Sequence, residues 1–207
     1  MSARKGTVGP IEWGMAERHK PGETAMGDRG VVLGTPTGAI VAVVDGLGHG
    51  PKAAEAANVA VEVLQRFHDK PVTDILARCH DALRGTRGVV MSIAAFDSSR
   101  HRMTWAGVGN VEGVIAPEYA KPGSRPTALI SRPGILGYRL PKLRPVSLPL
   151  EPGLTAILAT DGIDSSFVHE VRPVGSPDRV AQRILATHGS EKDDALVLVA
   201  RYLGNQG

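Results

Sequence analysis

The stretch "AIVAVVDGLGHGPKAAEAANVAVEVL", residues 39–64, decides how the rest of the chain is interpreted. A run of apolar residues ends in one carboxylate, Asp45, and three glycines follow within five residues. The apolar run predicts a buried strand, and the spacing of the later apolar residues predicts a helix that begins at Pro51, which suits a first helical position. We therefore expect Asp45 at the end of a rigid strand, where a side chain can be held in place for binding.

Three further acidic motifs lie at the ends of expected strands. "AILATDGID" repeats the same pattern, with Asp161 and Gly162 after an apolar run. "SEKDDALVLV" places Asp193 and Asp194 before an apolar run, and "MGDRG" places Asp28 before the first strand of the same region. Four strand ends therefore carry acidic side chains.

Carboxylates in such a set are the ligands that Mg²⁺ and Mn²⁺ prefer. Two of these ions about 3.5–4 Å apart can share a carboxylate and lower the pKa of a water enough to make it a nucleophile. A glycine after the aspartate lets the backbone carbonyl turn toward a metal without a Cβ in the way. Asp-Gly is also an ordinary turn dipeptide, and two aspartates commonly open a solvated strand. From the residues alone, a two-metal hydrolase site and ordinary turns both stay open.

The composition is that of a globular protein, with 42% hydrophobic and 22% charged residues and a formal charge of +3 in 207 residues. Aromatic residues make up only 4% and the basic residues are scattered, which disfavours nucleic acid as a partner. No apolar run reaches the ~20 residues that span a bilayer, and we do not expect the N-terminal residues to form a signal peptide. A single cysteine excludes an internal disulfide and CxxC zinc sites. We expect one domain over residues 1–207, a monomer in the cytoplasm with no membrane contact.

The order of expected elements argues for an α+β protein. Residues 1 to about 20 are expected to form a polar lead-in or a first edge strand. Helices are expected at 51–69, 72–85 and 176–189, and strands at 29–46 (two), 88–110 (a hairpin), 111–118, 127–134, 137–141, 154–162 and 193–203. This order lacks the regular alternation of a doubly wound sheet and suits mostly antiparallel strands covered by helices.

Other motifs are less informative. "DGLGHG" precedes a helix but lacks the GK[ST] ending of a P-loop. Cys79 lies on the apolar face of its expected helix and is interpreted as a core residue. His49 is a candidate acid or phosphate contact, with a plain surface histidine as the alternative.

Taken in order, "MGD", "VVDGLGHG", "ATDGID" and "KDDALVLV" resemble the PP2C-type metal-dependent protein phosphatases, in their SpoIIE-like bacterial branch. The resemblance extends over about residues 20–203. It implies a four-layer α-β-β-α sandwich of two mostly antiparallel sheets flanked by helices, with two Mn²⁺ or Mg²⁺ ions at one edge. It also implies hydrolysis of phosphoserine or phosphothreonine by a metal-bridging water, without a covalent enzyme intermediate.

The resemblance assigns roles by position. Asp45 would bridge both metals and Gly46 would offer its carbonyl to them. Asp161 and Asp193 would ligate one metal, and Asp28 would hold a metal-bound water.

The chain departs from the family pattern at two places. Eukaryotic members carry an arginine shortly before the first acidic motif, where it grips phosphate, and "KPGETAMGD" has none. Arg29 and His49 are the candidate substitutes. Ser165, with Asp164 beside it, stands where eukaryotic members have another aspartate.

The motifs begin by residue 26, so we expect a bare catalytic domain. Together with "GVGN" at 107–110 and "PGILGY" at 133–138, this resembles the RsbX-type phosphatases, which act on phosphorylated STAS-domain proteins of the stressosome. An anti-sigma-factor antagonist is the alternative substrate, and a non-catalytic phosphoprotein-binding module of the same fold is the alternative function. The basic segment "YRLPKLRP", residues 138–145, is a candidate for partner discrimination.

Overall fold

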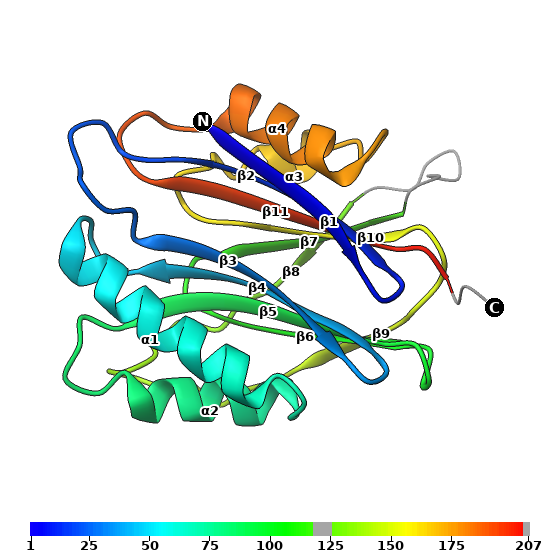
Figure 1. Cartoon of the computed structure of the whole chain (residues 1–207), viewed down its shortest axis with the longest axis horizontal. Coiled ribbons are helices and arrows are strands. Elements are labelled where there is room, and N and C mark those ends of the chain that lie inside the picture. The colour runs from blue at the N-terminus through cyan, green and yellow to red at the C-terminus, as the bar shows by residue number, and fades with distance from the viewer. Residues whose placement is uncertain (118–125, 205–207) are drawn as a thin grey trace.

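The computed structural model describes residues 1–117 and 126–204 and contains two stacked sheets (Figure 1). The first sheet has, in spatial order, β1 (Ser2–Val8), β2 (Ile11–Arg18), β11 (Ala195–Tyr202), β10 (Leu154–Ala159), β7 (Glu112–Pro117) and β8 (Thr127–Leu129). The second has β3 (Asp28–Thr35), β4 (Gly38–Gly46), β5 (Val89–Asp97), β6 (Arg102–Val108) and β9 (Val146–Pro149). Every pairing between these strands is antiparallel.

Helices cover the outer face of each sheet (Figure 1). On the second sheet lie α1 (Pro51–Phe67) and α2 (Val72–Ala82). On the first sheet lie α4 (Pro177–His188) and the short α3 (Phe167–Glu170). The expected four-layer α-β-β-α sandwich is therefore confirmed. None of the helices in the described parts of the chain has the length and apolar character needed to cross a membrane.

The continuous apolar run in the sequence of β4 is explained by its position in the second sheet. Successive side chains of a strand point to opposite faces. Val41 and Val43 pack into the core between the two sheets, whereas Ile40, Ala42 and Val44 pack under α1 and α2. Both faces of the strand are buried, so alternation with polar residues is absent until the strand ends.

The N-terminal region differs from the expectation of a lead-in or single edge strand. It forms a hairpin in which β1 is the edge strand and β2 is an interior strand paired with β11. The turn is Gly9-Pro10, between the paired residues Val8 and Ile11, and Gly9 has a φ of 52°. Gly-Pro is a turn signal, so the sequence pattern could indicate the hairpin. No local pattern indicates the pairing of β2 with β11, which lies far along the chain.

Three smaller differences concern the second half of the chain. The strand expected at 137–141 is wrong: Gly137 and Tyr138 form a tight turn, in which the N–H groups of Tyr138 (3.1 Å) and Arg139 (2.8 Å) donate to the carbonyl of Ile135. Both β9 and α3 were missed because each is only four residues long. Glu118, expected to end a strand, lies outside the described residues.

Candidate metal centre

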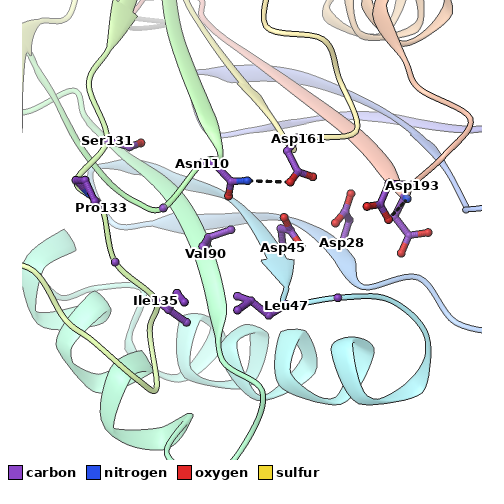
Figure 2. Close-up of a pocket in the computed structure, with 14 residues that line it drawn as sticks. Asp28, Asp45, Leu47, Val90, Asn110, Ser131, Pro133, Ile135, Asp161 and Asp193 are labelled. Carbon is purple, nitrogen blue, oxygen red and sulfur yellow. Dashed lines mark hydrogen bonds between the residues drawn. The ribbon is translucent and has the colours of Figure 1, made fainter.

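Five aspartates line one cavity of about 520 Å³ at the edge of the two sheets (Figure 2). They are Asp28, Asp45, Asp161, Asp193 and Asp194. The rest of the lining is small or apolar apart from Asn110 and Ser131, and it includes no Arg, Lys or His side chain in the described part of the chain. The four acidic motifs of the sequence thus converge on one place.

Sheet register brings these acids together from distant parts of the chain. Asp28 opens β3 and Asp45 is the next-to-last residue of β4, and the two are direct partners across the ladder. Asp161 follows the end of β10, and Asp193 and Asp194 precede β11, which pairs with β10 in antiparallel fashion. Because the end of one strand meets the start of its antiparallel partner, all five carboxylates share one edge.

The glycine after each key aspartate lets a neighbouring backbone approach closely. A Cβ on Gly46 would lie 2.2 Å from the carbonyl oxygen of Ala53 in α1, and one on Gly162 would lie 1.9 Å from that of Asp194. Any side chain would push these segments apart and displace the aspartates. Close packing is thus a structural reason for both Asp-Gly pairs. Gly46 itself is buried and is not among the residues that line the cavity.

A buried threonine joins three strands at the site. Thr160 donates a hydrogen bond from Oγ1 to Asp28 Oδ2 (2.7 Å) and accepts one from the N–H of Leu196 (2.9 Å). Because Leu196 is in β11 and Asp28 in β3, the hydroxyl ties the two sheets together behind the carboxylates. The sequence interpretation missed Thr160, although it directly precedes Asp161.

The neighbouring aspartates 193 and 194 have different surroundings. Asp194 is buried and accepts backbone N–H bonds from Lys20 (2.8 Å) and Gly27 (2.6 Å), so it fixes the loop before Asp28. Asp193 is partly exposed, and its Oδ1 accepts only the N–H of Asp194 (2.9 Å) among the bonds in the described residues. Asp193 is therefore the freer of the two to bind a ligand.

Asp194→Asn is expected to destabilise the protein by about 1–3 kcal/mol, because an amide cannot accept both backbone N–H bonds and leaves one buried donor unpaired. Turnover should fall less than in Asp193→Asn. Urea unfolding and phosphate release measured on both variants check this. Equal stability of Asp194→Asn and the wild type would contradict the assigned role of Asp194.

Burial and mutual repulsion disfavour the ionised form of the central aspartates. Burial, followed by the charges of Asp161, Asp193 and Asp194, raises the pKa of Asp45 to about 8. Burial and the charge of Asp45 also raise the pKa of Asp28 well above its usual value. In the described residues, no three Asp, Glu, His or Cys side chains lie close enough to hold a metal ion as they stand. Carboxylates without a counter-charge repel each other, and a divalent cation would offset that repulsion, so the donor set fits hard cations.

The two residues expected to substitute for the family arginine do not line the cavity. Arg29 donates to the side chain of Asn58 in α1 (Nε to Oδ1, 3.0 Å) and to the carbonyl of Met26 (2.6 Å). His49 pairs with Glu23. Their placement leaves both occupied by other partners.

Asp164 and Asn110 lie in different positions relative to the cavity. Asp164 lies outside the cavity and accepts the N–H of Ser166 (2.9 Å) next to α3. Asn110, not singled out as a site residue, donates from Nδ2 to Asp161 Oδ2 (2.8 Å; Figure 2). It orients that carboxylate, and its only signal in the sequence was its place in "GVGN".

Cys79→Ser is expected to leave turnover within about twofold of the wild type. Cys79 is fully buried in α2, away from the cavity, and burial raises the pKa of its thiol to about 12, so no thiolate is available as a nucleophile. Phosphate release in Mn²⁺ checks this. Loss of activity in Cys79→Ser with a normal unfolding transition would contradict a metal-based reaction.

The chain is similar to known proteins in sequence and in fold. The family of Stage II sporulation protein E (SpoIIE) matches residues 35–203. Phosphoserine phosphatase RsbX of Bacillus subtilis (strain 168) is 24% identical over 184 residues, or 88% of this chain and 90% of that protein.

Two solved structures share the whole fold. A chain solved in work on the bacterial stressosome, a modular system adapted to control secondary messenger signalling, is 30% identical, with a TM-score of 0.82 over 92% of this chain and 99% of that chain. RsbX in complex with magnesium is 22% identical, with a TM-score of 0.83 over 97% of this chain and 99% of that chain. The chain belongs to the SpoIIE family, a PP2C-like group of protein phosphatases.

Proposed function

We propose that this protein hydrolyses phosphoserine or phosphothreonine on STAS-domain proteins of a stress-signalling complex, using two Mn²⁺ or Mg²⁺ ions. The observation that carries the proposal is the convergence of five aspartates on one cavity in a chain of this family. We further propose that it acts as a monomer in the cytoplasm.

The proposed roles are those that the family resemblance assigns by position. Asp45, Asp161, Asp193 and the carbonyl of Gly46 are the groups that would hold the cations. Asp28, whose carboxylate accepts the Thr160 hydroxyl, would contact a cation through water. When bound, the cations supply positive charge for the phosphoryl oxygens and lower the pKa of a water. The carboxylates at the sheet edge would hold the cations in a fixed place for this chemistry.

The segment that leads away from the cavity suits an acidic partner. Ser131, Pro133, Gly134 and Ile135 line the cavity, and the segment continues along the surface to Pro145. Between residues 126 and 150 the chain has four Arg or Lys and no Asp or Glu. Tyr138 is 84% exposed, and three of those four basic residues are exposed as well. Positive charge around a phosphate-processing cavity attracts a phosphoprotein that carries acidic groups near its phosphorylated residue.

A substrate panel tests the proposal. STAS-domain proteins of the host are phosphorylated by their own kinases, and their dephosphorylation rates are compared with those of unrelated phosphopeptides. We expect at least about tenfold faster reaction on one STAS protein class, equivalent to ~1.4 kcal/mol of additional transition-state binding. Preference for an anti-sigma-factor antagonist over a stressosome scaffold would identify the alternative substrate. Equal slow rates on all substrates would contradict the STAS assignment and leave phosphatase activity standing.

A further inference from the structure

The cavity lacks a positive group for the substrate phosphate. Its lining carries five carboxylates and, in the described residues, no basic side chain. Five ionised carboxylates carry a charge of −5, and two divalent cations would reduce it to about −1. A phosphoserine brings a further charge of about −1.5 to −2. A cationic side chain at the rim would offset this repulsion. The following inference rests on the proposed function and identifies the residue that supplies that charge.

Within residues 1–117 and 126–204, Arg29, His49 and Arg132 are poorly placed for this role, whereas Arg87 is well placed. Arg29 and His49 are occupied as described above. Arg132 does not line the cavity, although Ser131 and Pro133 on either side of it do. The Arg132 side chain is partly buried, and its Nε is enclosed without a hydrogen-bond partner among the described residues.

Arg87 lies in the loop between α2 and β5. Asp45 pairs with Val90 and Gly46 with Val89, and the N–H of Leu47 donates to the carbonyl of Gly88 (3.1 Å). The next step of this register places Arg87 opposite Gly48, which lines the cavity. An Arg87 guanidinium nitrogen lies 2.9 Å from the position that a Cβ on Gly48 would take.

The surroundings of Arg87 leave its guanidinium available. The residue is exposed, and no hydrogen bond or ion pair engages its side chain in the described parts of the chain. Gly48 has a φ of 85°, which favours glycine, and the missing side chain leaves the space in which the guanidinium lies. The long side chain can therefore swing over Gly48 to the mouth of the cavity.

We propose that Arg87 binds the phosphoryl oxygens of the substrate from across Gly48. A guanidinium presents a planar fork of donors that matches two phosphate oxygens, so it positions the group as well as offsetting its charge. In eukaryotic members of the family, an arginine before the first acidic motif binds this phosphate. Arg87 would bind it from a different part of the chain.

The test compares Arg87→Ala with Arg84→Ala, a matched control. Arg84 lies three residues earlier, is exposed, and pairs with Asp81 (3.3 Å) away from the cavity. In Arg87→Ala, kcat/KM for p-nitrophenyl phosphate in Mn²⁺ should fall roughly 10- to 100-fold, as for loss of a charge-assisted hydrogen bond. Binding of inorganic phosphate, measured by calorimetry, should weaken by a similar factor. Arg87→Lys should recover part of the loss, and Arg84→Ala should behave as the wild type.

Each outcome separates the two proposals. If the wild type is active and Arg87→Ala matches Arg84→Ala in both measurements, Arg87 is not the phosphate-binding residue. The same conclusion follows if Arg87→Ala weakens Mn²⁺ binding but not phosphate binding. If the wild type neither releases nor binds phosphate, the proposed function fails and the Arg87 assignment falls with it.

Discussion

Asp45→Asn is expected to lower phosphate release in Mn²⁺ by at least about a thousandfold, because the central ligand contributes several kcal/mol to the reaction. Burial and the charges of Asp161, Asp193 and Asp194 oppose the ionisation of Asp45, and burial and neighbouring carboxylates do the same for Asp28. An amide has no negative charge and is a weaker ligand for hard cations. The Asp45→Asn variant should therefore lose turnover and bind Mn²⁺ weakly in calorimetry.

The matched control is Asp164→Asn. Asp164 is an exposed aspartate just beyond Asp161, outside the cavity, and an asparagine can still accept the N–H of Ser166. It should keep wild-type turnover. Turnover in Asp45→Asn within tenfold of the wild type would contradict the role of Asp45 as the bridging ligand.

Metal-free protein is expected to lose stability as the pH rises from about 5 to about 8, and this loss should be largely absent in Asp45→Asn. The pKa of Asp45 is about 8 in the folded chain, against an ordinary value of about 3.9 in the unfolded chain. Between these values the folded state holds a proton that the unfolded state has released, so raising the pH favours unfolding. Asp28, whose pKa is also raised, adds to the effect in the same direction.

Divalent cations should reverse this dependence. They bind the ionised carboxylates and displace protons, so their stabilisation grows as the pH rises toward 8. Urea unfolding in EDTA and in Mn²⁺, at steps from pH 5 to pH 9, measures both slopes. Asp164→Asn again serves as the control, because hydrogen bonds from Ser166 hold the pKa of Asp164 below its usual range. Stability in EDTA that rises from pH 6 to pH 9 would contradict the repulsion described here.

The sequence predicted those parts of the site that depend on local pattern. Asp45 and Asp161 each follow an apolar run. A buried strand that ends in a charged residue can be recognised from the amino-acid sequence alone. The antiparallel α+β architecture followed from the order of elements. Gly46 and Gly162 were also singled out, although the structure adds close packing as a reason for them.

Residues that act through pairing between distant segments were not predictable. Thr160 matters because Asp28, 132 positions away, accepts its hydroxyl, and no local pattern indicates that contact. The separation of roles between Asp193 and Asp194 depends on the loop near Gly27, which Asp194 holds from 167 positions away. Arg87 is placed by the register of β4 and β5 beyond their ends. Such contacts depend on the assembled sheets.

The most direct test of the central claim is phosphate release by the wild-type protein from p-nitrophenyl phosphate and from a phosphoserine peptide, with Mn²⁺ and with EDTA. We expect release in Mn²⁺ or Mg²⁺, none in EDTA, recovery when Mn²⁺ is added in excess, and none from Asp45→Asn. Release that continues in EDTA would contradict a metal-dependent reaction at the five aspartates. Binding of the phosphoserine peptide without release under any metal condition would instead identify a phosphoprotein-binding module.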